Sequence, residues 1–281
     1  MTSSSSEGIT PLASLSLTHV YYNPSDPLSH LSAYLALLPQ ALIIVYLTLS
    51  YSTREAEVLL LFLGQLTNEA INFILKRLIK EERPSHIISS TLTINKAYGM
   101  PSSHAQYMAF WAVALGLFLC VRHRPVHKGH PGPVPAEEVD LFKDVTKVYK
   151  EKGFEGVSRH IEAYSHSPWS MAQRVSVTAA ACAAAGLVSW SRVYLGYHTV
   201  KQVLAGTAAG VVSAVAWFAV TYLMRETGLL AWLLEFPVAR WLRIRDLVVE
   251  EDLCQAGWEK WEERRVREVG DKEKKSKKKK T

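Results

Sequence analysis

Cysteine is scarce in this sequence, and basic residues are missing from its beginning. The chain has three cysteines in 281 residues, and they lie in or beside apolar segments or in the charged tail, so a disulfide framework is not expected. The first 30 residues contain no Lys or Arg. A cleaved secretory signal needs a basic start before a short apolar core, so none is expected either.

Charge is also absent from long stretches of the chain. Overall, 48% of the residues are hydrophobic and 21% are charged, averages that decide little between soluble and membrane proteins. Five stretches approach the ~20 residues that a helix needs to cross a bilayer. Four of them are uncharged, namely 31–51, 104–121, 175–191 and 203–224, and the fifth, 58–75, is apolar apart from a polar stripe that includes Glu69. We predict an all-α, polytopic membrane bundle of about five helices; buried helices of a soluble protein are the alternative.

Small and polar residues within these segments predict how the helices pack. Residues 179–186 are nearly all Ala and Gly, and Gly206 and Gly210 lie about one turn apart, which favours a close approach between the fourth and fifth segments; low-bulk sequence facing lipid is the alternative. Gln65, Asn68 and Asn72 repeat at helical spacing in the second segment. Because polar groups inside a span usually face the bundle interior, we interpret this stripe as supporting the floor of an active site; a role in holding helices together is the alternative.

The basic residues predict the side of the membrane on which each polar region lies. The chain divides into a polar lead 1–30, first helices 31–121, a polar insert 122–174, last helices 175–224, and an amphipathic and basic tail 225–281. Most Lys and Arg residues lie in the insert and tail, so the positive-inside rule places both in the cytosol. The lead and loops 76–103 and 192–202 then face the lumen. Segment 229–242 is short for a span, and we predict an interfacial helix there.

Two basic residues follow the second segment in the pattern Lys76-x6-Arg83-Pro84. On a helix, seven residues make nearly two turns, so we predict Lys76 and Arg83 on one face, with Pro84 ending the helix. Alone, such a pair usually marks the flank of a membrane helix. Its meaning depends on two further clusters on the same predicted side.

The second cluster opens the third segment. Ser102, Ser103 and His104 follow a proline, and the free backbone N–H groups of a helix start form an anion site. An ordinary helix cap explains the serines but not the histidine.

The third cluster joins the last two segments. Arg192 ends the fourth, His198 opens the fifth, and Gln202 follows one turn later. Arginine is a planar, bidentate donor to phosphate. Together the three clusters describe a phosphate cage with an acid and a base.

The three clusters resemble the signature motifs of the type 2 phosphatidic acid phosphatase superfamily, K-x6-R-P, P-S-G-H and S-R-x5-H-x3-D. The resemblance covers about residues 30–225 and implies a phosphatidic acid phosphatase/vanadium haloperoxidase-like core. Ser103 replaces the glycine of the second motif, and Gln202 replaces the aspartate of the third. Both replacements, and the wording of 98–104 and 191–199, are similar to the eukaryotic dolichyl diphosphatases.

The resemblance implies that dolichyl diphosphate is hydrolysed at a histidine. His198 is expected to attack the terminal phosphorus, while His104 protonates the departing lipid phosphate and later activates water. Gln202 would fix the tautomer of His198 without adding charge, a loss that a phosphate leaving group could tolerate. The phosphate oxygens are expected to be held by Lys76, Arg83, Ser102, Ser103 and Arg192. We expect no metal or other cofactor, because three fixed cations could supply the neutralisation that Mg²⁺ gives elsewhere.

The expected partners are dolichyl diphosphate, or a similar polyprenyl diphosphate, and the bilayer, with no nucleic acid. The lysines before Thr281 fit a dilysine retrieval signal or a contact with anionic lipid, and the resemblance implies the endoplasmic reticulum and protein N-glycosylation. Three alternatives remain: a phosphatase for another lipid phosphate, a non-catalytic lipid-binding or transport protein of the same fold, and a soluble haloperoxidase relative.

Overall fold

The computed structural model describes most of the helical part of the chain. The described residues are 13–15, 20–84, 98–123 and 169–250, with single residues between 147 and 153 and between 253 and 264. The chain forms two compact units, residues 1–119 with 175–245 and residues 120–174 with 246–281. Most of the predicted insert and the terminal lysine run lie outside the described residues.

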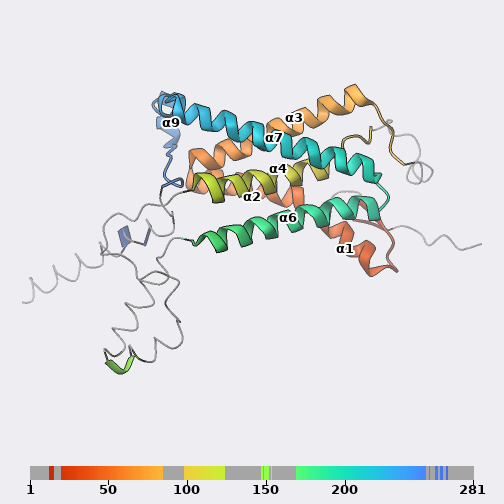
Figure 1. The fold of residues 1–281 in the computed structure, drawn as a ribbon, viewed down its shortest axis with the longest axis horizontal. Helices are drawn as coiled ribbons and strands as arrows, with labels where there is room; N and C mark the ends of the chain where they lie inside the picture. The colour runs from red at the N-terminus through yellow and green to blue at the C-terminus, as the bar shows by residue number, and fades with distance from the viewer. Residues whose placement is uncertain are drawn as a thin grey trace, which may run out of the picture. The chain divides into compact units, whose positions relative to one another are not determined.

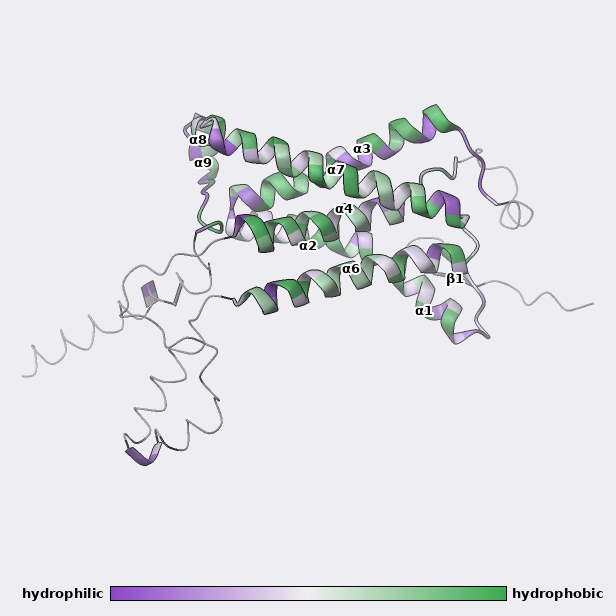
Figure 2. Ribbon diagram, in the orientation of Figure 1, coloured by the Kyte–Doolittle hydropathy of each residue, from purple (hydrophilic) through white to green (hydrophobic). Residues whose placement is uncertain are grey.

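Five helical stretches are long and apolar enough to cross a membrane, which confirms the predicted bundle. They are Pro27–Thr53, which combines α1 (Pro27–Leu35) and α2 (Leu38–Thr53); α3 (Ala56–Ile79); Ser103–Arg122, which combines α4 (Ser103–Leu117) and the π-helical turn η2 (Phe118–Arg122); α6 (Met171–Tyr194); and α7 (Val200–Glu226). These helices lie side by side (Figure 1), and hydrophobic residues predominate along them (Figure 2). The chain is therefore a multi-pass membrane protein.

The helices α4 and α7 pack closely because glycines line their contact. A Cβ atom built at Gly206 would lie 2.5 Å from the backbone oxygen of Ser102, and one built at Gly210 would overlap the backbone oxygen of Gln106. A side chain at either position would push the two backbones apart. The predicted close approach of α7 to another helix is confirmed, but its partner is α4 and not the Ala- and Gly-rich α6 that the sequence suggested, where a Cβ atom at Gly186 would meet nothing within 4 Å.

The polar stripe of α3 contacts α4 directly. The Gln106 side-chain amide donates to Asn68 Oδ1 at 2.9 Å, and Asn72 Nδ2 donates to Gln106 Oε1 at 2.7 Å. All three side chains are buried. Inside a membrane, these bonds satisfy groups that lipid cannot satisfy. The stripe therefore joins α3 to α4 and fixes their register, which is the role that the sequence analysis gave as its alternative to the floor of an active site.

Two ion pairs lie at the end of the bundle where α3 begins and α7 ends. Arg225 Nη2 lies 2.7 Å from Glu57 Oε2, and Arg245 Nε lies 2.8 Å from Glu55 Oε1. Segment 229–242 follows α7 at this end (Figure 1). The structure divides it into two six-residue helices, α8 (Leu229–Leu234) and α9 (Pro237–Leu242), so the expectation of one continuous helix was wrong. The proline at the start of α9 interrupts the helical hydrogen bonds.

The polar lead contains a short hairpin that the sequence did not predict. Strands β1 (Ala13–Leu15) and β2 (Val20–Tyr22) pair antiparallel. Val20 is buried in a cluster with Ala36 and Tyr197, and the Tyr21 backbone N–H donates to the Tyr197 hydroxyl at 2.7 Å. The hairpin thus rests on the loop between α6 and α7.

Candidate active site

Backbone hydrogen bonds join the three sequence clusters at one end of the bundle. The Gly99 N–H donates to the Glu81 carbonyl at 2.7 Å, which links the first cluster to the second. The Ser102 N–H donates to the Gln202 carbonyl at 3.0 Å, which links the second to the third. Figure 1 shows the ends of α3 and α6 and the starts of α4 and α7 at this same end. Helix ends from distant parts of the sequence therefore form one site.

The first cluster is not one helix, as its spacing had suggested. Helix α3 ends at Ile79, and Lys80 adopts the left-handed conformation, with a φ of 54°, that ends the helix. Lys76 therefore lies in the last helical turn, whereas Arg83 lies in the segment beyond it. The prediction of one helical face was wrong because the chain must leave the helix before Pro84 to reach Gly99. Both basic side chains are half-buried.

A tight turn after α6 carries His198 into the site. The backbone N–H groups of Tyr197 and His198 both donate to the Arg192 carbonyl, at 3.0 and 3.2 Å. Gly196 has a φ of +73°, which a glycine adopts without steric cost. Thr199 then caps α7 in a capping box with Gln202. The turn leaves His198 buried, with a relative exposure of 3%.

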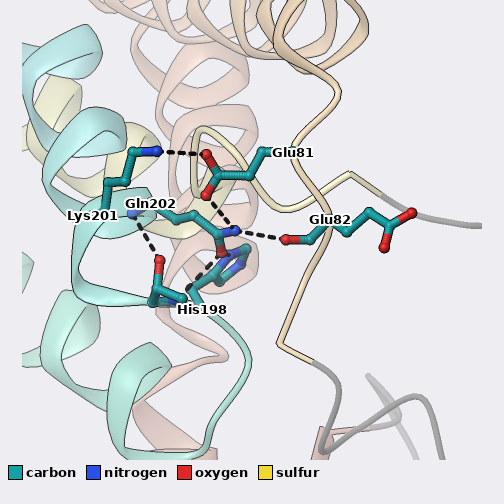
Figure 3. Close-up of polar contacts among 6 residues, drawn as sticks. Glu81, Glu82, His198, Lys201 and Gln202 are labelled. Carbon is teal, nitrogen blue, oxygen red and sulfur yellow. Dashed lines mark hydrogen bonds and ion pairs between the residues drawn. The ribbon is translucent and has the colours of Figure 1, made fainter.

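The side chain of Gln202 determines which nitrogen of His198 carries a proton. Gln202 Oε1 lies 3.2 Å from His198 Nδ1, and Gln202 Nε2 donates to Glu81 Oε1 at 3.1 Å and to the Glu82 carbonyl at 2.9 Å (Figure 3). Both partners of Nε2 are acceptors, so the amide cannot be reversed without facing oxygen against oxygen. Its Oε1 must therefore accept a hydrogen bond from the Nδ1–H group, so the proton of the neutral ring stays on Nδ1 and the lone pair of His198 is on Nε2.

The surroundings of His198 keep its imidazole neutral. Burial, followed by the positive charges of Arg83 and Arg192, lowers the pKa of His198 to about 3. A neutral ring at physiological pH retains the lone pair that a nucleophile requires. Hydrogen bonds from Lys201 and Gln202 lower the pKa of Glu81, so its carboxylate is ionised.

Two arginines of the site have buried donor nitrogens without a hydrogen-bond acceptor in the described part of the chain. Nε and Nη1 of Arg192 and Nε of Arg83 are buried and have no hydrogen-bond partner among the described residues. The Arg192 guanidinium lies over the Tyr197 ring, 4.2 Å from its centroid. Buried donors without partners are costly, and this ring contact replaces only part of what water would give. These unpaired nitrogens are donors that an anion could accept from.

The start of α4 faces the same place. Ser102 is the N-cap, its Oγ is buried without a partner among the described residues, and Ser103 is the first helical residue. His104 Nε2 donates to the Ala36 carbonyl at 3.2 Å, at the break between α1 and α2. Because a carbonyl only accepts, Nε2 carries a proton and Nδ1 is the atom left to exchange one with a substrate.

Two members of the site carried no recognisable sequence signal. Glu81 lies within the x6 spacer of the first cluster, where the pattern leaves the residue type open. Tyr197 precedes the expected nucleophile and supports Arg192 with its ring. Their roles arise from contacts between segments that are distant in the sequence, which spacing alone does not reveal.

Comparison with known proteins identifies the family. Residues 57–226 match the PAP2 superfamily. This chain belongs to the PAP2 superfamily. The match spans all three clusters, from α3 to the end of α7. The sequence resemblance to the type 2 phosphatases is thereby confirmed.

The most similar relatives are named for one activity. A Neurospora crassa protein named as a dolichyldiphosphatase is 56% identical and covers 95% of this PAP2 chain and 99% of its own length. Dolichyldiphosphatase 1 of Homo sapiens is 34% identical over 83% of this chain and 81% of its own. The solved structure of a PAP2 type phosphatidylglycerolphosphate phosphatase from Bacillus subtilis covers 70% of the chain with 21% identity and a TM-score of 0.44, too low for comparing the sites residue by residue.

Proposed function

We propose that this chain hydrolyses dolichyl diphosphate to dolichyl phosphate and inorganic phosphate. The observation that carries the proposal is the neutral, buried His198 near Arg83 and Arg192, three of whose buried nitrogens have no acceptor among the described residues. A nucleophile and an anion site at the end of a membrane bundle suit a phosphate group attached to a lipid. The choice of lipid rests on the relatives, which are named dolichyldiphosphatases and align over about four fifths of the chain or more.

The first chemical step transfers the terminal phosphoryl group to the protein. His198 Nε2 attacks the terminal phosphorus while the bond from phosphorus to the bridging oxygen breaks. The bridging oxygen leaves with dolichyl phosphate and takes a proton from His104. Gln202 accepts the Nδ1 proton of His198 in a hydrogen bond and holds the ring in line as positive charge develops on it.

The second step releases phosphate and restores both histidines. A water molecule attacks the phosphorus of the phosphohistidine, His104 accepts the proton of that water, and the bond to His198 Nε2 breaks. The phosphate oxygens are held throughout by the cationic side chains and the helix start, namely Lys76, Arg83, Ser102, Ser103 and Arg192. Fixed cations in a water-poor site stabilise the charge of the transition state, so the reaction is expected to need no metal.

The position of the site fits a substrate that stays in the bilayer. The helices that end there expose large apolar side chains at the same end, among them Phe73 and Leu78 of α3 and Val200 and Leu204 of α7. A polyprenyl chain can lie against such surfaces while its diphosphate reaches the site. The basic insert and tail favour a cytosolic location, which places the site on the lumenal face. In the endoplasmic reticulum the reaction would return carrier lipid for protein N-glycosylation.

The test measures phosphate release from dolichyl diphosphate by the purified full-length chain in detergent. We expect release by the wild type in EDTA, and loss of at least about a thousandfold in His198→Ala. Dolichyl phosphate and phosphatidate serve as competing substrates. Faster turnover of a monophosphate would favour a different lipid phosphatase, and binding without any phosphate release would favour the non-catalytic alternative. Activity lost in EDTA and restored by Mg²⁺ would refute the metal-independent mechanism.

A further inference from the structure

The residue that holds the expected nucleophile carries no charge, although a carboxylate lies directly behind it. Gln202 accepts from His198 with its Oε1 and donates with its Nε2 to Glu81 Oε1 (Figure 3). The order is carboxylate, amide, imidazole. The Gln202 amide therefore connects the His198 ring to the ionised carboxylate of Glu81, which the ring does not touch.

This chain of three residues is fixed at each step. The Glu82 carbonyl also accepts from Gln202 Nε2, and the Thr199 N–H also donates to Gln202 Oε1, at 3.3 Å. The amide therefore has acceptors on its nitrogen side and donors on its oxygen side. A Cβ atom at Gly99 would lie 2.8 Å from the Gln202 amide, so the backbone of the second cluster also confines it.

We propose that Glu81 is a positioning residue for His198, which supplies through Gln202 the negative charge and the orientation that a carboxylate on the imidazole would supply directly. The proposal rests on the proposed function of the site. Polarised hydrogen bonds in series strengthen one another, most of all where the groups are buried, as the Gln202 and His198 side chains are. As His198 becomes positive during phosphoryl transfer, the amide dipole and the Glu81 carboxylate are aligned to stabilise it.

The alternative role for Glu81 is a structural ion pair with Lys201. Glu81 Oε2 lies 2.9 Å from Lys201 Nζ, and the two side chains are 30% and 72% exposed. Exposed pairs of this kind contribute little to stability. The link between the first and second clusters uses the Glu81 backbone carbonyl, which any side-chain variant keeps. A Glu81 variant therefore removes the carboxylate while leaving the backbone connections of the site in place.

The first experiment compares Glu81→Gln with Lys201→Met. A glutamine at position 81 can still accept from Gln202 but carries no charge. We expect kcat for dolichyl diphosphate to fall about ten- to a hundredfold, the effect of one charge-assisted hydrogen bond, with KM changed less than about threefold. Lys201→Met breaks the ion pair and keeps the carboxylate, so its kcat should stay within about threefold of wild type. Wild-type kcat in Glu81→Gln, or an equal loss in both variants, would overturn the proposal.

The second experiment moves the negative charge from position 81 to position 202. Gln202→Glu alone places two carboxylates together and should be impaired. In the double variant Glu81→Gln with Gln202→Glu, the order becomes amide, carboxylate, imidazole, and we expect kcat to exceed that of Glu81→Gln alone by at least about fivefold. A structural pair with Lys201 predicts no such recovery, so a double variant slower than Glu81→Gln refutes the relay.

Thermal unfolding of each variant separates a loss of activity from a loss of fold. The two proposals also fail differently. If the wild type releases no phosphate from dolichyl diphosphate, the proposed function is wrong. If the wild type is active and the variants behave as the ion pair predicts, only the role of Glu81 is wrong.

Discussion

Replacing Arg192 with methionine should make the protein more stable in the absence of phosphate and leave it nearly inactive. Arg192 is buried, and two of its donor nitrogens have no partner among the described residues. Each such donor costs about 1–3 kcal/mol. The contact of the guanidinium with the Tyr197 ring returns about 1–2 kcal/mol. Methionine fills a similar volume without a charge, so the free energy of unfolding should rise by about 2 kcal/mol.

The same substitution should greatly reduce the rise in Tm that phosphate produces. A stability gain of about 2 kcal/mol corresponds to a rise in Tm of roughly 4–8 °C. In the wild type, phosphate should raise Tm by occupying the site, whereas Arg192→Met should gain much less. The lost charge-assisted hydrogen bonds should lower kcat/KM for dolichyl diphosphate roughly 10²–10⁴-fold.

Intrinsic tryptophan fluorescence of the detergent-solubilised chain, heated in phosphate-free buffer and again with orthophosphate, measures both effects. Arg240→Met is the matched control, because Arg240 is an exposed residue of α9 that lies 3.5 Å from Glu235. Its Tm should stay within about 1 °C of wild type in both buffers. A lower Tm for Arg192→Met than for wild type without phosphate, or an equal phosphate shift in both proteins, would refute the reasoning.

Three further predictions test the packing and the electrostatics of the site. In thermal melts, Gly210→Ala should unfold at a lower temperature than wild type, because its Cβ atom would overlap the Gln106 carbonyl. Gly186→Ala is the control: its Cβ atom would meet nothing within 4 Å, so this variant should be as stable as wild type or more stable by up to about 1 kcal/mol. The His198 ring, assigned by NMR with His198→Gln, should show no titration between pH 5 and 8, because its pKa is lowered to about 3 and the ring stays neutral above that value; a midpoint near 6.5 would contradict the burial argument. Tyr197→Phe should keep kcat within about threefold but lose about 1 kcal/mol of stability with the Tyr21 contact, whereas Tyr197→Leu should also weaken phosphate binding through Arg192.

The elements that sequence reasoning identified are those set by local composition. Spans of about 20 apolar residues have one stable form in a membrane, so their number and approximate bounds followed from the sequence. The spacing of the glycines in α7 and of the polar residues in α3 likewise indicated that these residues contact another helix. The candidate site was also visible, because His104, Arg192 and His198 stand at helix ends that a bundle brings together.

The remaining features depend on contacts between distant segments. The left-handed Lys80 ends α3 early because the chain must turn toward Gly99, and no local signal marks that turn. Glu81 meets Gln202 across 121 positions of sequence, and its carboxylate looks like any exposed charge in the spacer. The hairpin of the lead forms against Tyr197, whose hydroxyl partner lies 176 positions away.

The discontinuity between α1 and α2 has a consequence for acid–base chemistry. Pro39 stands in the first turn of α2, and the Ala36 carbonyl just before it accepts from His104. The interruption of the first span at this point leaves a carbonyl free to fix the tautomer of the imidazole, so a helix that holds the protein in lipid also orients the proposed proton donor. A continuous first helix would use this carbonyl in its own hydrogen bonds and would leave the His104 ring without this acceptor.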